Sequence, residues 1–160
     1  DPRFTSVKKG TKNIVYLWAR KEFQNISKCY DCGIPVVKPR HVSKNILIMD
    51  FEGKDGKPEN TLLESEIDEN DYHQSIELIS NLFKKAKLVH GDFSEYNIFK
   101  TKNGLKLFDL GSAVDTTHPN TMNFLKRDIN NITNFFVKRG LTVENPADIL
   151  ERITKWALKN

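Results

Sequence analysis

Three polar residues near the middle of the chain have the types and spacing of a phosphoryl-transfer site. Asp92 follows His90 and Gly91, Asn97 comes five residues later, and Asp109 begins an Asp-Leu-Gly sequence. A loop carboxylate such as Asp92 can accept the proton of an attacking hydroxyl group or orient that nucleophile. The side-chain oxygens of Asn97 and Asp109 are of the kind that bind Mg²⁺, which neutralises phosphate charge during transfer.

The spacing of Asp92 and Asn97 is weak evidence by itself, because aspartate and asparagine are common in turns. His90 in isolation is more often a structural residue that bonds a loop carbonyl than a catalytic base. The order of all three elements, with a hairpin expected between Asn97 and Asp109, is much more specific. We therefore interpret these residues as parts of one site.

A β-hairpin is expected between the two candidate metal ligands. Short apolar stretches at residues 97–99 and 105–108 flank the sequence TKNG at residues 101–104. An Asn-Gly pair favours a tight turn because both residues tolerate positive φ angles. Such a hairpin would fold Asn97 and Asp109 back towards each other.

Four helices are predicted, mainly from apolar residues that recur at helical spacing. They cover approximately residues 13–30, 72–86, 121–139 and 146–158. Acidic residues before the second helix, Gly140 after the third, and Asn145 with Pro146 at the start of the fourth are typical helix-end signals. The apolar face expected for the first helix comprises Ile14, Leu17, Trp18, Phe23, Ile26 and Tyr30.

An antiparallel pair of strands is predicted at residues 36–42 and 45–51, on either side of a short turn. The second strand is a nearly continuous apolar run, so we expect it to be mostly buried. Residues 52–60 are rich in glycine, proline and charge, which predicts a connector that acts as a hinge.

The composition limits the remaining function classes. The chain has 160 residues, of which 38% are hydrophobic and 29% charged, and its mean hydropathy is −0.53. These values are typical of one globular domain and exclude a fibrous or disordered chain. No apolar stretch approaches the length that spans a bilayer, and no signal peptide is recognisable, so we expect a cytoplasmic protein without a membrane partner. The net charge of +4 is compatible with a polyanionic partner.

Cys29 and Cys32 form a CxxC pair that could in principle be redox-active or half of a zinc site. A structural zinc site needs four ligands, and the sequence has neither a second CxxC nor a close histidine pair. A thioredoxin-like pair would begin a helix, whereas this pair ends one. We therefore expect both cysteines to be structural.

The segments HGDFSEYN and FDLGSAV resemble the catalytic loop and the metal loop of the RIO-type atypical protein kinases. Further segments are similar to the type-1 branch in an archaeal-like version, namely DPRF, WARKEFQN, ILIMDFEGKDGKP and THPN followed by FLKRDINNITNFF. The resemblance covers nearly the whole chain. It implies an α+β, protein-kinase-like fold with a remnant N-terminal lobe at residues 1–52, a hinge at 53–60 and a mainly helical catalytic lobe at 61–160.

The resemblance also implies roles for the three central residues. Asp92 matches the catalytic base, while Asn97 and Asp109 match the ligands of Mg²⁺, with Mn²⁺ as an alternative. In this family the metal-loop aspartate is also implicated as a phosphate acceptor, which gives an aspartyl-phosphate and an ATPase-like cycle. Asp109 would be that acceptor.

Other positions match the ATP-binding residues of the family. Met49 corresponds to the gatekeeper, and the backbone of Asp50 and Glu52 corresponds to the adenine-binding hinge. Pro58 and Glu64 match positions near the ribose. In the first predicted helix, Glu22 matches the glutamate that pairs the nucleotide-binding lysine.

The sequence departs from ordinary protein kinases at several points. Ser94 stands where Ser/Thr kinases carry a lysine, and no activation segment separates Asp109 from the helix expected at residue 121. No glycine-rich loop is present, and Lys38 follows the Glu22 helix instead of preceding it. We therefore expect the chain to lack the first strands of the N-terminal lobe, to bind ATP weakly and to turn it over slowly.

The leading hypothesis is an ATP- and Mg²⁺-dependent RIO-type serine kinase or ATPase. By resemblance, it would act in maturation of the small ribosomal subunit, with a pre-ribosomal particle as partner and indirect contact with RNA. Two alternatives remain open at this stage: a small-molecule phosphotransferase of the aminoglycoside type, and a catalytically silent docking fragment.

Overall fold

The computed structural model describes residues 11–155 and begins with a long helix, α1 (Thr11–Asp31). The helix predicted at residues 13–30 is confirmed, but part of its expected apolar face is not buried. Leu17, Trp18 and Tyr30 are 38%, 55% and 43% exposed, whereas Ile26 is fully buried. Among the described residues, the elements with the most extensive contact to α1 are strands β1 (Pro39–Ser43) and β2 (Ile46–Met49) and the turn η3 (Leu82–Ala86), and these three side chains do not lie under them.

Strands β1 (Pro39–Ser43) and β2 (Ile46–Met49) form the predicted antiparallel pair. The expectation of a mostly buried second strand is wrong, because Ile46 and Ile48 are 59% and 50% exposed. Leu47 and Met49 alternate with them and pack against the core. A two-stranded sheet that packs on α1 with one face leaves its other face open.

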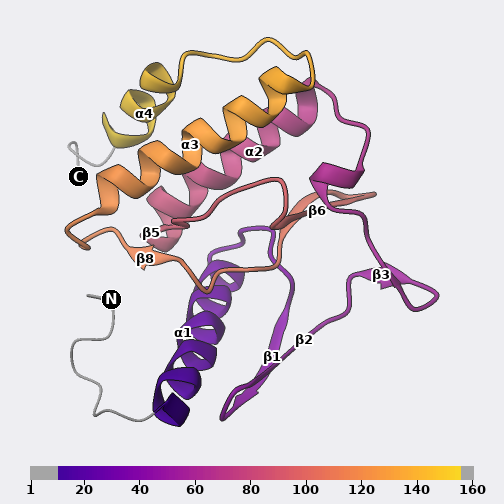
Figure 1. The fold of residues 1–160 in the computed structure, drawn as a ribbon, viewed down its shortest axis with the longest axis vertical. Helices are drawn as coiled ribbons and strands as arrows, with labels where there is room; N and C mark the ends of the chain where they lie inside the picture. The colour runs from indigo at the N-terminus through magenta and orange to yellow at the C-terminus, as the bar shows by residue number, and fades with distance from the viewer. Residues whose placement is uncertain (1–10, 156–160) are drawn as a thin grey trace.

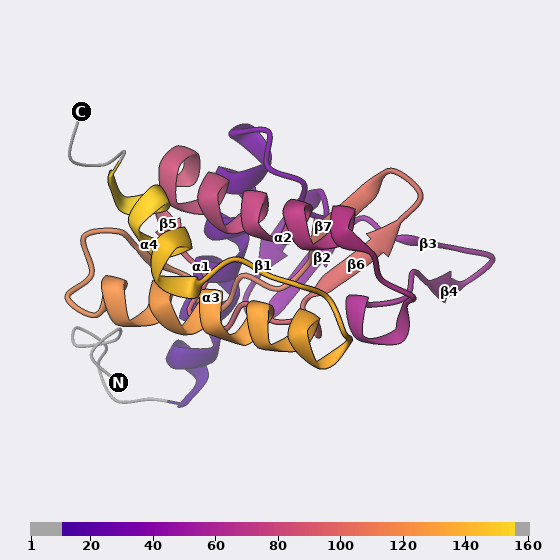
Figure 2. The same ribbon diagram turned by 90° about the horizontal axis from the view of Figure 1, so that it is seen from above.

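The connector contains a small hairpin that the sequence did not reveal. Strands β3 (Gly53–Lys54) and β4 (Lys57–Pro58) pair antiparallel around Asp55 and Gly56, which both have positive φ angles. This hairpin projects from the body of the molecule (Figures 1 and 2). A short turn of 3-10 helix, η2 (Leu62–Glu64), follows it.

Three helices form a layer on the other side of the molecule (Figure 1): α2 (Glu69–Asn81), α3 (Thr121–Lys138) and α4 (Pro146–Lys155). Helix α2 continues into a π-helical turn, η3 (Leu82–Ala86), which confirms the prediction for residues 72–86. Asp68 caps α2, and Asn145 accepts a hydrogen bond from the Ala147 amide at the start of α4. The last three residues of the predicted fourth helix, 156–158, lie outside the described residues, as does the DPRF segment.

Two further strand pairs lie between α1 and the helical layer. Strand β5 (Leu88–Val89) pairs with β8 (Val114–Asp115), and β6 (Ile98–Thr101) pairs with β7 (Gly104–Leu107). The second pair is the predicted hairpin. Its turn differs from the expectation, because Gly104 has a positive φ angle of 111° and Asn103 does not.

One continuous apolar core joins these elements. Side chains from α1, the β6–β7 hairpin and all three helices of the layer contribute to it, with Ile26, Leu107 and Phe136 fully buried. Among residues 11–155, no helix is long and apolar enough to span a membrane. Helices combined with small antiparallel sheets make this an α+β fold.

Candidate active site

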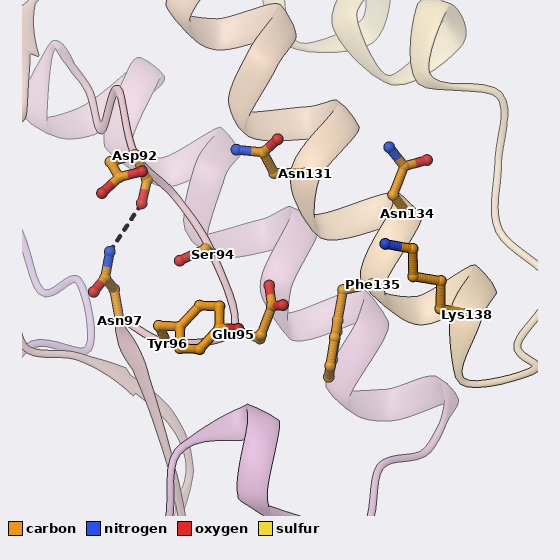
Figure 3. Close-up of a pocket in the computed structure, with 9 residues that line it drawn as sticks. All are labelled: Asp92, Ser94, Glu95, Tyr96, Asn97, Asn131, Asn134, Phe135 and Lys138. Atoms are coloured by element: carbon orange, nitrogen blue, oxygen red, sulfur yellow. Dashed lines mark hydrogen bonds between the residues drawn. The ribbon is translucent and has the colours of Figure 1, made fainter.

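The candidate active site begins where strand β5 ends. The loop at residues 90–97 leaves Asp92 exposed and places Asn97 directly before β6. The Asn97 side-chain amide donates a hydrogen bond of 2.9 Å to the Asp92 backbone carbonyl (Figure 3). The two residues therefore belong to one ordered loop, and the Asp92 carboxylate remains accessible.

The β6–β7 hairpin places Asn97 near Asp109, as the sequence predicted. Ile98 pairs with Leu107, and the Phe108 amide donates to the Asn97 carbonyl at 3.4 Å. The two candidate ligands thus flank the open end of the same hairpin. Asp109 Oδ1 accepts the Gly111 amide at 3.0 Å, which fixes the orientation of this carboxylate.

The oxygen atoms at this end of the hairpin fit a magnesium ion. Asn97 uses its nitrogen in the bond to Asp92, so its Oδ1 is available, and Asp109 retains Oδ2. Mg²⁺ is commonly held by one or two protein oxygens together with phosphate oxygens and water. Asn97 and Asp109 would hold the ion, and Mg²⁺ would supply positive charge to the phosphate oxygens of a bound nucleotide.

Asp128 on α3 holds the catalytic loop, a role that the sequence did not reveal. Its carboxylate accepts the amides of Gly91 at 2.8 Å and Phe93 at 3.0 Å, and it is 1% exposed. Burial raises the pKa of this carboxyl, although the two amides, Arg127 and a proton on His90 act in the opposite direction. The sequence signal for this role is that Asp128, an acidic residue, occupies a position on the apolar face of α3.

Asn25 on α1 holds the metal loop in a similar way. Its side-chain amide donates to the carbonyls of Leu110 at 3.0 Å and Ala113 at 3.2 Å, and it is buried. Both bonds link residues more than eighty positions apart. The sequence contains no local signal for them.

Glu22 lies against the same loop. A Cβ atom on Gly111 would lie 3.7 Å from the Glu22 carboxyl group. Burial raises the pKa of Glu22, and the negative charge of Asp109 raises it further. A cation between these two carboxyl groups would reverse that effect, because an opposite charge favours the ionised form.

His90 is buried behind the loop and packs edge-on against Phe93, with ring centroids 5.6 Å apart. Among residues 11–155, neither ring nitrogen has a partner in good hydrogen-bond geometry, although the Asp109 backbone lies close enough to favour the protonated ring. Burial lowers the pKa of His90, against the opposing charges of Asp128, Asp109 and Asp92. A buried, neutral imidazole serves as packing rather than as a base.

The residues predicted to bind adenine lie at the end of β2. Met49 is half-buried, and the Asp50 amide donates to the Lys38 carbonyl at 2.9 Å. Asp50 and Glu52 lie between β2 and β3, in the segment that the family resemblance assigns to the adenine-binding hinge. Their carboxylates are engaged elsewhere, Asp50 with Arg40 and Glu52 with Lys106.

The two predicted ribose residues have different surroundings. Pro58 is exposed in β4. Glu64 caps the η2 turn, because its Oε2 accepts the Thr61 amide at 2.9 Å and the Thr61 hydroxyl at 3.1 Å. This capping is a role of Glu64 that sequence reasoning missed.

The cysteine pair has structural surroundings. Cys29 and Cys32 are free thiols at the end of α1, and Cys29 is fully buried. Burial raises the pKa of Cys29 to about 12, with the neighbouring Cys32 also raising it. A thiol with so high a pKa stays protonated at neutral pH and is a poor nucleophile.

A cavity of about 500 Å³ adjoins Asp92 on the side of α3 (Figure 3). Its walls come from the catalytic loop and from the C-terminal half of the helix. The lining residues are Asp92, Ser94, Glu95, Tyr96, Asn97, Asn131, Asn134, Phe135 and Lys138. The exposed carboxylate of Asp92 is therefore reachable from this cavity.

The fold and the site define a protein-kinase-like catalytic domain, and comparison with known proteins identifies the family. Residues 1–149 match the family model of the RIO domain, so the chain belongs to the RIO family. The RIO-type serine/threonine-protein kinase Rio1 of Thermoplasma acidophilum is 37% identical over 155 residues, which cover 97% of this chain and 82% of that protein. The serine/threonine-protein kinase rio1 of Dictyostelium discoideum is 34% identical over 151 residues.

A solved structure supports the same assignment. The Rio2 kinase of Chaetomium thermophilum, in its ADP/Mg²⁺-phosphoaspartate complex, superposes with a TM-score of 0.72 and 26% identity over 88% of this chain. The predicted α+β, protein-kinase-like fold and the RIO resemblance are thereby confirmed. The chain spans 26% of the Dictyostelium protein, 49% of its Haloferax volcanii relative and 45% of the Rio2 chain.

Proposed function

We propose that this chain carries the catalytic centre of a RIO-type serine kinase and ATPase that uses ATP and Mg²⁺. The observation that carries the proposal is the hydrogen bond from the Asn97 side chain to the Asp92 carbonyl. This bond leaves the Asn97 oxygen for a metal ion and leaves the Asp92 carboxylate for a hydroxyl group. Mn²⁺ in place of Mg²⁺ remains a prediction.

Asp92 acts as base and positioning group in the proposed transfer. A serine hydroxyl in the neighbouring cavity gives its proton to the Asp92 carboxylate while its oxygen bonds to the γ-phosphorus. The bond from that phosphorus to the bridging oxygen of ADP breaks, and ADP leaves. Asp128 and Asn25 keep the two loops in place, so little reorganisation accompanies the step.

An ATPase cycle through Asp109 is the second candidate. The Rio2 kinase of Chaetomium thermophilum forms a complex that contains ADP, Mg²⁺ and a phosphoaspartate. By the family resemblance, Asp109 is the residue of this chain that matches the metal-loop aspartate. In that cycle the Asp109 carboxylate attacks the γ-phosphorus, ADP leaves, and water later cleaves the aspartyl-phosphate.

We further propose a cytoplasmic protein that acts on a precursor of the small ribosomal subunit. The family resemblance supports this partner, and the net charge of +4 is compatible with an RNA-containing particle. Co-sedimentation with purified pre-ribosomal particles at several salt concentrations tests this part separately.

A radiolabelled-ATP assay tests the chemistry. The full protein that contains this chain is incubated with γ-labelled ATP and Mg²⁺, and the wild type is compared with Asp92→Asn and Asp109→Asn. Hydroxylamine-stable label that falls by about 100-fold or more in Asp92→Asn supports serine phosphorylation. Hydroxylamine-labile label that is lost in Asp109→Asn supports the aspartyl-phosphate cycle, and no label with any variant contradicts both candidates.

A further inference from the structure

The cavity beside Asp92 begins at Asn97, one of the two candidate metal ligands, and extends from there towards α3. One wall is the catalytic loop with Ser94, Glu95 and Tyr96, and the other is the C-terminal half of α3 (Figure 3). Neither Asp109 nor any residue of β2 lines it. A molecule in this cavity would therefore reach Asp92 from the side of α3.

The chain that follows the metal loop leaves this cavity uncovered. Between Asp109 and α3, the chain forms strand β8, which pairs with β5 and not with the catalytic loop. On α3, Asn134 and Lys138 remain exposed, while the Phe135 ring is 6% exposed and forms part of the wall. An extended segment of another polypeptide can therefore lie along α3 up to Asp92.

The polar groups of the cavity suit a polypeptide. The side-chain amides of Asn131 and Asn134 each offer donors and an acceptor, which match the donors and acceptors of a peptide backbone. Tyr96 adds an aromatic ring that is 60% exposed. Purely apolar ligands are disfavoured because they would leave these polar groups without partners.

The charges of the cavity are arranged unevenly. Among residues 11–155, neither Lys138 nor Glu95 takes part in an ion pair. Within this part of the chain, no carboxylate therefore lies close to Lys138, and no cation lies close to Glu95. Glu95 and Asp92 belong to the loop wall, whereas Lys138 ends α3, and Figure 3 shows Phe135 between Glu95 and Lys138. An acidic group is therefore favoured at the Lys138 end and disfavoured beside Asp92.

We propose that this cavity is the acceptor site, and that it takes an extended polypeptide segment whose acidic side chain pairs with Lys138 while its serine hydroxyl reaches Asp92. The inference rests on the proposed kinase function and adds a preference for acidic residues near the acceptor serine. Lys138 is then a specificity-determining residue, and Asp92 alone receives the proton.

A charge-swap experiment on the full protein tests the proposal. Three synthetic peptides with one serine each, flanked by glutamate, alanine or lysine, are phosphorylated with ATP and Mg²⁺. We expect the wild type to prefer the glutamate peptide, and Lys138→Glu to lower kcat/KM for it by about fivefold and raise that for the lysine peptide. Lys126→Glu is the matched control, because Lys126 is exposed on the same helix but lines a different cavity.

A binding measurement separates this inference from the kinase function. The 160-residue chain labelled with ¹⁵N is titrated with the glutamate peptide, and shifts of the Ser94, Asn131 and Asn134 signals that are lost in Lys138→Glu are expected. Binding without any phosphate transfer would support the cavity as a peptide site and contradict the kinase proposal. Transfer with an unchanged peptide preference in Lys138→Glu, or peptide shifts confined to other residues, would overturn the acceptor-site inference and leave the kinase proposal intact.

Discussion

The chain before residue 61 and the chain after it differ in how they use their apolar side chains. Among residues 11–155, ten large apolar side chains are exposed, and seven of them lie before residue 52. They are Val15, Leu17, Trp18, Tyr30, Ile46, Ile48 and Phe51. The later region buries most of its apolar residues around Phe93, Leu125 and Phe136. The catalytic loop therefore rests on the well-packed later region. The earlier region supports the site only through a limited contact with the later one.

That contact combines an apolar edge with a few polar bonds. Ile26 and Val36 enter the common core, and the Val37 amide donates to the Leu107 carbonyl at 2.9 Å. The polar part includes Asn25, which bonds the metal loop, and an ion pair of 2.6 Å between Glu52 and Lys106. A small number of polar residues therefore joins the two regions at the site. Four measurements test whether the later region is the well-packed one and whether these few contacts join the earlier region to it.

Removal of the Asp128 carboxylate should have the largest effect. Asp128→Ala leaves the buried amides of Gly91 and Phe93 without partners, so we expect the free energy of unfolding to fall by about 3 kcal/mol. Urea denaturation monitored by circular dichroism measures this change. Asn123→Ala, at an exposed position of the same helix, is the control. A loss below about 1 kcal/mol would mean that Asp128 does not support the loop.

Removal of the Asn25 amide tests the junction between the two regions. Asn25→Ala leaves the carbonyls of Leu110 and Ala113 without this donor, and we expect a loss of about 2 kcal/mol of unfolding free energy. Gln24→Ala, at the exposed neighbouring position, should change stability little. Equal effects of the two substitutions would contradict the assignment of Asn25 as an anchor.

The pH dependence of stability tests the burial of His90. Because burial lowers the pKa of His90 from 6.5, the unfolded chain binds more protons than the folded chain below that pH. The free energy of unfolding should therefore fall as the pH decreases through 6.5, by at most about 1.4 kcal/mol per pH unit.

The matched variant for this test is His90→Gln. The raised pKa of Asp128 acts in the opposite direction, since stability then falls as the pH rises above the unfolded-state pKa. The informative quantity is thus the difference between the wild-type and His90→Gln slopes in urea denaturation. Equal slopes for the two proteins would show that His90 is not desolvated.

The smallest effect is expected on the open face of β2. Ile48→Thr replaces a half-exposed side chain, so the free energy of unfolding should change by no more than about 0.5 kcal/mol. The same substitution at Ile129, which is fully buried on α3, should cost several times more. Comparable losses in thermal or urea unfolding would show that the face of β2 is covered in solution.

Local sequence signals were sufficient to predict the candidate chemistry and most elements of this protein. The order of Asp92, Asn97 and Asp109 around a hairpin, and the four helices, were predictable because residue type and periodicity act over a few positions. The turn at Gly104 and the hairpin β3–β4 were only partly predictable, since several loop geometries suit the same glycine and polar residues.

The residues that support and surround that chemistry became apparent only in the folded chain. Asp128 reaches the catalytic loop across more than thirty residues, and Asn25 reaches the metal loop across more than eighty. The exposure of Trp18 and the cavity at Lys138 likewise depend on which elements pack together. Such contacts join distant parts of the chain, and the periodicity of a single segment carries no information about its partner.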